Sequence, residues 1–370
     1  MKFTINQENF SEILQQHLPV LPNRTTIPIL NSLKWDLSNG KLRMHSTDLE
    51  ISLITEIEVE SEDEGSIAVP AKKLSEIVRE LASEPVTVET DENFRVKLKG
   101  ESGVYKVAGS NPDDFPAVPS EGLELKAELT GKMFKRMINQ TSFAVSHDDM
   151  RPTLCGVFLQ ILSDEIRTVA TDGHRLTKYV SKESPGIGEN IEAIIPVKAL
   201  RLAVKNIGDE DEIKISLGAK FFMIEHKGNY LYSRLIEGKY PLYENVIPKN
   251  NINTLMTGID GLSSSLRRVA IFSNSLTKQV KLSLSSGKIT VSAEDMETGG
   301  EAEEELVVDY DGDEMDIGFN ADYVIEALRH VDSQDVKFKF GTSDSASIIE
   351  PSEYAENEEY IMLLMPVRLP

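Results

Sequence analysis

The amino-acid sequence predicts an α+β fold in which three similar domains follow one another, each with antiparallel sheets and two helices. A segment that reads as strand, proline and helix occurs at Ser66–Ala82 and again at Ala193–Ile207. A third copy, Asp316–Val331, has Asn320 where the first two have proline, and the anchors are about 125 residues apart. Such regular spacing indicates an internal repeat.

Other features recur in the same register. An acidic residue follows a strand at Thr47-Asp48, Thr171-Asp172 and Glu294-Asp295. A helix preceded by an apolar strand opens each repeat, over residues 6–18, 130–142 and 260–272. Aromatic-proline turns end the first two repeats, at 110–119 and 236–248. We therefore expect domains at 1–121, 126–248 and 252–370, separated by short linkers that contain Pro, Gly or Asn.

Short strands with alternating apolar side chains fill the rest of each repeat, as in ISLITEIEVE (51–60), IKISLG (213–218) and VKLSLSSG (280–287). Turn residues separate the strands, at Asn39-Gly40, Lys227-Gly228-Asn229 and Ser285-Ser286-Gly287. Direct hairpin connections of this kind predict antiparallel sheets rather than alternating strand–helix–strand units.

The second strand–proline–helix segment is basic in an acidic chain. Pro196 suits a first helical turn, where its missing N–H costs nothing. At helical spacing the segment carries an apolar face of Val197, Leu200, Val204 and Ile207. Another face carries Lys198, Arg201 and Lys205, with no acidic residue between them. We expect the apolar face to pack against a sheet and the basic face to be exposed.

Positive charge is concentrated on the predicted helices. The chain of 370 residues has 39 Lys and Arg against 61 Asp and Glu, a net charge of -22. The six expected helices (7–18, 70–82, 130–142, 196–207, 260–272 and 320–331) hold 12 basic and 7 acidic residues. Exposed helix faces attract Lys and Arg in general, which is one explanation. The other is that the helices face one polyanion, because phosphate contacts bind without reading base sequence.

Composition also limits the cellular location that we expect for the protein. The chain has no run of 18 apolar residues and no evident signal peptide, so we expect no membrane span and a cytoplasmic location. The single Cys155 excludes an intramolecular disulfide and fits a reducing compartment. Because Cys155 lies in the apolar run TLCGVFLQIL, we expect a buried, inert thiol.

Catalytic motifs are absent or weak. The sequence has no Walker A motif and no G-x-S-x-G, Gly186-Ile187-Gly188 reads as a loop, and Asp309–Asp316 lacks the ligand spacing of a calcium site. No metal or cofactor is expected. The most enzyme-like string is TDGHRL (171–176), which allows a hydrolase or transferase centred on Asp172 and His174. The repeat instead assigns Asp172 to a structural turn, but His174 and Arg175 have no equivalents in the other repeats.

Several motifs resemble a known family. ATDGHRL, YPLYENVIPKN and the terminal MPVRL, together with MKFTI, VPAKKLSEIVREL and DFPAVP, are similar to the bacterial DNA polymerase III beta subunit family, the sliding clamps. The resemblance covers the whole chain. It implies a non-catalytic processivity factor with three clamp domains, closed into a ring as a head-to-tail homodimer around duplex DNA.

The implied ring has a size that can be checked. Twelve helices spaced about 10 Å apart give a circumference of roughly 120 Å and a hole about 28 Å wide. Groove depths give B-DNA a radius of about 10 Å, so a duplex passes with a layer of water around it. Loose, sequence-independent charge suits sliding, since tight phosphate pairing would stop it.

The resemblance also implies three sets of site residues. DNA would face Arg24, Lys72, Arg79, Lys132, Arg136, Arg151, Lys198, Arg201, Lys205, Arg267 and Arg268. A pocket for a partner peptide would comprise Leu154, Thr171, Gly173, His174, Arg175, Leu176, Pro241, Val246, Ala346, Leu363, Met365, Pro366, Val367, Arg368 and Leu369. The dimer contact would use Lys73, Tyr105, Val107, Ile271, Phe272, Glu301, Glu303 and Glu304.

The expected partners follow from the same family. They are double-stranded DNA, the alpha subunit of the replicative DNA polymerase, the clamp loader, other proteins with a clamp-binding motif, and a second copy of the chain. The remaining alternative from the residues themselves is a structural α+β adaptor that never touches DNA.

Overall fold

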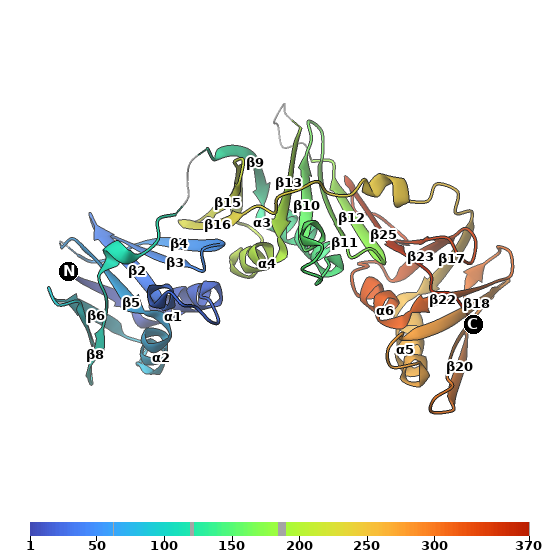
Figure 1. The fold of residues 1–370 in the computed structure, drawn as a ribbon, viewed down its shortest axis with the longest axis horizontal. Coiled ribbons are helices and arrows are strands. Elements are labelled where there is room, and N and C mark those ends of the chain that lie inside the picture. Colours follow the sequence, from blue (N-terminus) through green and yellow to red (C-terminus); the bar gives the residue numbers. More distant parts are fainter. Residues whose placement is uncertain (62, 119–121, 184–189, 370) are drawn as a thin grey trace. The chain divides into compact units, whose positions relative to one another are not determined.

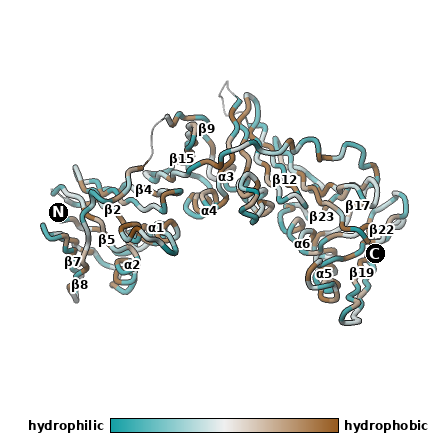
Figure 2. The backbone as a smooth tube through the Cα atoms, viewed as in Figure 1, coloured by the Kyte–Doolittle hydropathy of each residue, from teal (hydrophilic) through white to brown (hydrophobic). Residues whose placement is uncertain are grey.

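The computed structural model describes residues 1–61, 63–118, 122–183 and 190–369, and Figure 1 shows its helices and strands. Hydrophobic and hydrophilic residues are interspersed along both the strands and the helices (Figure 2). This is the pattern expected of elements that bury one side and expose the other.

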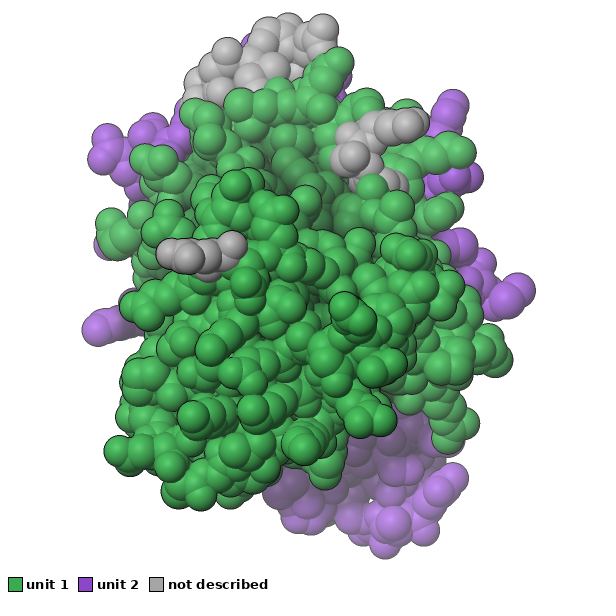
Figure 3. Space-filling view, turned by 90° about the vertical axis from the view of Figure 1, so that its left-hand side faces the viewer, with its two compact units in different colours: residues 1–135, 198–235 green, residues 136–197, 236–370 purple. Residues whose placement is uncertain are grey.

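Contacts divide the chain into two compact units, which Figure 3 distinguishes by colour. Unit 1 consists of residues 1–135 and 198–235, and unit 2 of residues 136–197 and 236–370. The division passes through α3 (Gly131–Asn139) and α4 (Val197–Asn206), the two helices of the second repeat. The expected domain limits at 121, 126, 248 and 252 stay a prediction.

Unit 1 begins with a four-stranded sheet and two helices. The strand order is β1 (Lys2–Asn6), β6 (Pro85–Thr90), β7 (Arg95–Lys99) and β8 (Val104–Ala108). Helices α1 (Gln7–His17) and α2 (Ala71–Glu80) bury Phe10 and Leu74 in the same core as the fully buried Trp35. The Trp35 ring has Phe3 at its edge, with ring centroids 5.8 Å apart.

A second sheet of unit 1 extends from the first repeat into the second. Its order is β5 (Gly65–Pro70), β2 (Ser32–Ser38), β3 (Lys41–Thr47), β4 (Ile51–Glu58), β16 (Asn229–Arg234), β15 (Phe221–His226), β14 (Glu212–Leu217) and β9 (Glu124–Thr130). The repeats meet where β4 pairs antiparallel with β16, with Leu53 opposite Leu231. The short helix η1 (Leu18–Val20) directly follows α1, η2 (Pro28–Asn31) directly precedes β2, and η3 (Pro112–Asp114) follows β8.

Unit 2 contains the corresponding long sheet, which joins the second repeat to the third. Its order is β13 (Ile191–Pro196), β10 (Gly156–Ile161), β11 (Ile166–Thr171), β12 (Arg175–Ser181), β25 (Glu358–Leu364), β24 (Ser347–Pro351), β23 (Asp335–Phe340), β17 (Asn253–Gly258) and β21 (Asp309–Tyr310). Here β12 pairs antiparallel with β25, with Tyr179 opposite Tyr360.

Unit 2 also contains a four-stranded sheet and the last two helices. The strand order is β20 (Gly300–Val307), β19 (Lys288–Asp295), β18 (Gln279–Ser285) and β22 (Met315–Asn320). Helices α5 (Ile259–Val269) and α6 (Ala321–Arg329) bury Leu262, Leu266, Val324 and Leu328. Short helices occur at η4 (Ser142–Ala144), η5 (Pro152–Leu154), η6 (Tyr243–Val246) and η7 (Ala270–Phe272).

The six expected helices lie where the sequence places them, and the sheets are antiparallel as predicted. The hairpin turns are confirmed too, since Asn39 and Gly40 both have positive φ, at 50° and 70°. In the third repeat the Asn320 side chain accepts hydrogen bonds from the backbone N–H groups of Asp322 and Tyr323. An asparagine can therefore replace proline here because it caps the helix start.

Two expectations for the basic helix are corrected. Pro196 is the last residue of β13, so it precedes the first helical turn, as Pro70 precedes α2. Proline has no N–H to donate to a neighbouring strand, and this makes it suitable as the last residue of β13. Leu200 and Ile207 are buried as expected, but Val197 and Val204 are only half-buried, and Ala199, Leu202 and Ala203 are buried instead. Small side chains thus centre the packing face differently, while Lys198, Arg201 and Lys205 are exposed as expected.

Candidate functional site

The TDGHRL segment forms a tight turn between β11 and β12. The Thr171 hydroxyl donates to the carbonyl of Arg175 at 2.6 Å, and Asp172 Oδ1 accepts the N–H of Arg175 at 3.0 Å. The first repeat has the same bonds, because the Thr47 hydroxyl and Asp48 Oδ1 both bind the backbone of the strand that follows. The Asp172 carboxylate is therefore held by backbone donors as a structural turn residue, as the repeat predicts.

Arg175 is enclosed by groups from three segments of unit 2. Its guanidinium donates to Asp172 Oδ2 at 3.1 Å, to Glu326 Oε2 at 2.6 Å and to the carbonyl of Phe143 at 2.9 Å. The guanidinium carbon also lies 4.6 Å from the centre of the Tyr323 ring. Only 9% of the side chain is exposed. Three of its five N–H groups are thus bonded within the chain, and its contact with a partner peptide stays a prediction.

Other expected pocket residues do come together. Leu154, Leu176 and Leu363, from η5, β12 and β25, belong to one cluster of buried side chains in unit 2, which we call the apolar cluster. Its other buried members are Phe158, Val169, Ile194, Tyr240 and Tyr243, with Ile236, Ile247 and Ala346 partly buried against them. Phe158 and Tyr240 are stacked with their centroids 4.6 Å apart. The aromatic-proline turn after β16 supplies both tyrosines.

Exposed side chains lie along the chain next to the apolar cluster. Val246 and Leu242 are 55% and 80% exposed, although both neighbour the buried Tyr243. Pro241 and His174 are exposed as well. Leu242 was not among the expected residues, although its position in YPLYENVIP could have indicated it, since this string marks the end of a repeat.

The C-terminal segment is attached beside the turn. The N–H of Met365 donates to the carbonyl of His174 at 2.8 Å, and the Met365 side chain is 43% exposed. Beyond it, Val367 donates its N–H to the carbonyl of Gly318 at 2.9 Å. Val367 and Leu369 therefore run along β22, while Pro366 is half-buried and Arg368 is exposed. Of these residues, Met365 is the one tied directly to TDGHRL.

Most of the expected DNA-contacting cations are exposed. Arg24, Lys72, Lys132 and Lys205 extend from loops and helices, as do Arg79, Lys198, Arg201, Arg267 and Arg268. Some of these already have carboxylate partners, with Lys198 Nζ 2.5 Å from Asp48 and Arg268 bound through two nitrogens to Glu304. Arg151 is exposed too, but it donates to Asp148 and to the carbonyl of Asp172.

Arg136 is an exception among these cations. Its guanidinium donates to Asp332 at 2.5 Å and to Glu358 at 2.6 Å, and Gln140 donates to the same Asp332 carboxylate at 2.9 Å. Burial opposes its charged form, but the hydrogen bonds that it donates to both carboxylates keep the Arg136 pKa raised. The expected DNA contact is corrected, because this side chain ties α3 to the third repeat within unit 2.

The expected dimer residues lie on the edge strands β8 and β20 of the four-stranded sheets, on α2 and on η7. In unit 1, β8 is an edge strand on which Tyr105 is exposed. In unit 2, β20 is an edge strand with Glu301 and Glu303 exposed, and the nearby Ile271 and Phe272 are 77% and 42% exposed. Unpaired edges with exposed apolar side chains are able to pair with another chain.

The expectation that Val107 contributes to the dimer contact is corrected. Its side chain lies in the core of the first repeat with 9% exposure, so it faces inward from β8. Lys73 is exposed and lies 3.6 Å from Glu76, and Glu304 is bound to Arg268. Val104 and Val307, at 51% and 94% exposure, are edge residues that the sequence reading missed. The alternation of side chains along β8 and β20 was the available signal.

Three chemical expectations can be compared with the described residues. Cys155 is partly exposed rather than buried, and its Sγ donates to the carbonyl of Asp148. Burial together with the charges of Asp149 and Asp148 raises its thiol pKa, which disfavours the thiolate. Among the described residues no group of three His, Cys, Asp or Glu converges on a possible metal position. Nor does any described helix have the length and apolar character to cross a membrane.

Comparison with known proteins defines the class of fold and site. Family models for the DNA polymerase III beta subunit match in chain order, with the N-terminal domain at residues 1–119, the central domain at 128–242 and the C-terminal domain at 244–368. The Beta sliding clamp of Escherichia coli K12 is 32% identical over 375 residues, and that of Vibrio cholerae is 29% identical over 371 residues. Both alignments cover all of each chain.

Solved structures agree with this class. The Pseudomonas aeruginosa sliding clamp bound to griselimycin superposes with a TM-score of 0.95 at 28% identity. The clamp from Bartonella birtlesii bound to the same compound gives 0.94 at 27% identity, and both matches cover all of each chain. The chain belongs to the bacterial DNA polymerase III beta subunit family. This family consists of non-catalytic processivity factors, so the alternative of a hydrolase or transferase is wrong.

Proposed function

We propose that this chain is a DNA sliding clamp, which holds the replicative DNA polymerase on duplex DNA without reading its sequence. The observation that carries this proposal is the match of all three beta subunit domains over the whole chain. Two copies would join head to tail into a ring, and the ring would act in the cytoplasm. Topological linkage then replaces tight binding, so that dissociation becomes sliding.

Exposed cations on the helices support the contact with DNA. Lys132 on α3 and Lys198, Arg201 and Lys205 on α4 are all exposed in a chain whose net charge is -22. Such cations attract phosphates without base readout, and acidic surfaces elsewhere repel DNA from other faces. Arg24, Lys72, Arg79, Arg151, Arg267 and Arg268 complete the proposed set, and Arg136 is left out because two carboxylates already neutralise its charge.

Two exposed sheet edges support the proposed dimer. The β8 edge of one copy would pair with the β20 edge of the other, which satisfies backbone groups that each copy leaves unpaired. Ile271, Phe272, Tyr105, Val104 and Val307 would supply apolar contact, with Glu301, Glu303 and Lys73 at the rim. A contact of this kind uses different surfaces on the two copies and closes when the rotation completes a ring.

The apolar cluster supports a site for partner peptides. Its buried leucines and aromatics would underlie the exposed Val246, Leu242, Pro241, His174 and Met365, which can contact apolar anchors of a short segment. The alpha subunit of the polymerase, the clamp loader and other proteins with a clamp-binding motif would share this site. Arg175 would position it by fixing the TDGHRL turn.

Retention on closed DNA tests the clamp and the dimer together. The protein, loaded on nicked circular duplex, should remain bound in moderate salt during gel filtration and should be released when the circle is cut. Replacing Ile271 and Phe272 with alanine should abolish retention, whereas Leu276→Ala, also in an exposed position, should not. Equal retention on circular and linear DNA would contradict topological binding.

Peptide titration tests the partner site separately. A fluorescent peptide that contains the clamp-binding motif of the polymerase alpha subunit should bind the wild-type chain at least tenfold more tightly than the Val246→Ala and Met365→Ala double variant. Met296→Ala serves as a control, since this methionine is also exposed but lies outside the set. Equal loss of affinity in the control would contradict the assigned site.

A further inference from the structure

One face of α6, a helix of the third repeat, contacts the second repeat within unit 2. Tyr323, Glu326 and His330 are three and four residues apart, so they lie on the same side of the helix. The Tyr323 ring centre lies 4.6 Å from the guanidinium carbon of Arg175, and Glu326 Oε2 accepts a hydrogen bond from Arg175 Nη1 at 2.6 Å. The His330 ring is stacked on Phe143, with centroids 3.9 Å apart. The helix therefore holds the second repeat at several points.

Arg175 connects α6 to the TDGHRL turn. Its Nε donates to Asp172 Oδ2 at 3.1 Å, and Asp172 Oδ1 accepts the backbone N–H groups of His174 and Arg175 at 2.8 and 3.0 Å. The carbonyl of His174 in turn accepts the N–H of Met365 at 2.8 Å. His174 and Met365, which are exposed members of the proposed partner site, are thus tied to one rigid guanidinium whose position depends on α6.

The junction of unit 1 lacks the connection through an arginine. In the register of the repeat, Ile51 at the start of β4 takes the place of Arg175 at the start of β12. Leu202 on α4 takes the place of Glu326 on α6. Ile51 and Leu202 are both buried and apolar, so no ion pair can form between these positions.

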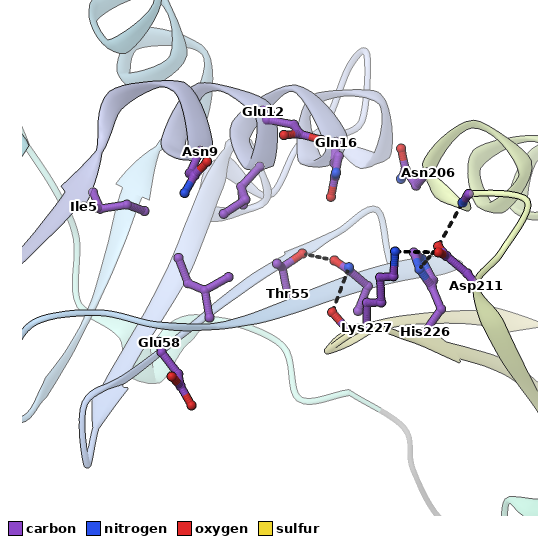
Figure 4. Close-up of a pocket in the computed structure, with 14 residues that line it drawn as sticks. Ile5, Asn9, Glu12, Gln16, Thr55, Glu58, Asn206, Asp211, His226 and Lys227 are labelled. Carbon is purple, nitrogen blue, oxygen red and sulfur yellow. Dashed lines mark hydrogen bonds and ion pairs between the residues drawn. The ribbon is translucent and has the colours of Figure 1, made fainter. Parts of the chain in front are cut away.

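A cavity of about 420 Å³ lies beside α1 at the unit 1 junction. Gln16, which Figure 4 shows at this cavity, takes the place of Gln140 in unit 2. Gln140 donates to Asp332 at 2.9 Å, but Gly208 takes the place of Asp332 in unit 1 and has no side chain that could accept such a bond. The side-chain connections from α6 and Asp332 are therefore particular to unit 2, which contains the proposed partner site.

We propose that Glu326 is a positioning residue of the partner-peptide site, and that this site is complete only while the junction between the second and third repeats is closed. The inference rests on the proposed function. Leu176 and Leu363 lie opposite each other across the pairing of β12 with β25, so both repeats contribute to the apolar cluster. A peptide that contacts both repeats stabilises the closed junction, and the closed junction strengthens peptide binding by the same factor.

Peptide titration of Glu326 variants tests the positioning role. The fluorescent peptide with the clamp-binding motif should bind Glu326→Ala about fivefold more weakly than the wild-type chain. Glu326→Gln keeps an oxygen that can accept from Arg175, so its affinity should stay within about twofold of the wild type. Asp322→Ala removes an exposed carboxylate from the same helix and should leave the affinity unchanged. No loss in Glu326→Ala, or an equal loss in either of the other variants, would overturn the positioning role.

Hydrogen exchange of the wild-type protein tests the coupling without a substitution. At saturating peptide, amides of β12 and β25 should exchange at least tenfold more slowly, because the peptide must leave before the junction opens. Amides of β18 and β19, in the four-stranded sheet of unit 2, should exchange at an unchanged rate. Peptide binding without slower exchange at β12 and β25, or with equal slowing in both sheets, would overturn the coupling and leave the site itself intact. Absence of peptide binding to the wild-type protein would instead overturn the proposed function, and the coupling with it.

Discussion

Each unit contains one junction between successive repeats, and the two junctions share a backbone design but differ in how side chains fill them. Both are antiparallel strand pairings, β4 with β16 in unit 1 and β12 with β25 in unit 2. In unit 2, the buried Arg175 and the partly buried Arg136 bind carboxylates of the third repeat. In unit 1, the ion pairs across the junction are largely exposed, and a cavity lies beside them.

This difference indicates that a continuous sheet does not by itself determine how strongly the junction between two repeats resists opening. A planar guanidinium held by several acceptors specifies one arrangement, and breaking a buried ion pair is costly. Exposed pairs such as Lys198 with Asp48 contribute little, because water screens them. We therefore expect the unit 2 junction to resist opening more than the unit 1 junction does.

The largest expected effect comes from removing Arg175. Arg175→Ala removes the cation from Asp172, whose side chain is 14% exposed, and from Glu326, whose side chain is 38% exposed, so the free energy of unfolding of unit 2 should fall by about 2–3 kcal/mol. Urea unfolding followed by circular dichroism measures the loss. Hydrogen exchange of peptides from β12 and β25 should show that it is local to the junction.

Arg234 provides the matched substitution in unit 1. It lies 3.5 Å from Glu50 and is 50% exposed, so Arg234→Ala should cost no more than about 1 kcal/mol. Equal losses for the two arginines would contradict the proposed difference between the junctions.

A second prediction concerns the stability of unit 1 at acidic pH. His17 is fully buried between Ser46 and Thr55, and Thr55 in turn donates to Asn229 across the unit 1 junction. Burial, with a smaller effect of His45, lowers the His17 pKa from 6.5 to about 3. The unfolded chain therefore binds this proton first, and the stability of unit 1 should fall as the pH drops below 6.5 towards 3. Between pH 7 and pH 5 the loss should be about 2 kcal/mol from this group.

Trp35 makes the measurement specific to unit 1, because it is the single tryptophan of the chain and is fully buried in that unit. Its fluorescence during urea unfolding at pH 7 and pH 5 gives the loss directly. His17→Gln should reduce the pH dependence by about 2 kcal/mol, leaving the contribution of His45, whose pKa is also lowered to about 3. An unchanged pH dependence in this variant would rule out His17 as a source.

Local structure and the repeat could be predicted from the sequence, because they depend on neighbours along the chain. The helices follow from apolar spacing, and the turn at Asp172 follows from its equivalence with Asp48. The family membership came from whole motifs rather than from single residues. These features involve contacts within a few residues of each other, for which side-chain type and spacing are sufficient.

Long-range partners could not be predicted in this way. Arg136 binds Asp332 and Glu358, which are 196 and 222 residues away, so nothing near Arg136 distinguishes it from an exposed cation. The same is true of Arg175 and Glu326. The prediction that Val107 is exposed was wrong for another reason. Both faces of VYKVA contain apolar residues, and alternation cannot decide which face is inside. The cavity likewise depends on how elements of two repeats meet.

The smallest expected effect tests the cavity of the unit 1 junction as a packing defect. Asn9 is an exposed residue on α1, one turn before Ile13, and it lines the cavity without a hydrogen bond to another described residue. Asn9→Leu should therefore add apolar contact with Ile13 in the cavity and raise the free energy of unfolding of unit 1 by about 0.5–1 kcal/mol.

Asn9→Ala separates filling from helix propensity, because alanine is the better helix former but leaves the space empty. If packing at this junction is loose, leucine stabilises unit 1 more than alanine does when Trp35 fluorescence follows unfolding in urea. If alanine stabilises it equally or more, the gain comes from α1 itself. In that case the cavity costs the fold nothing, and the contrast between the two junctions would rest on the arginines alone.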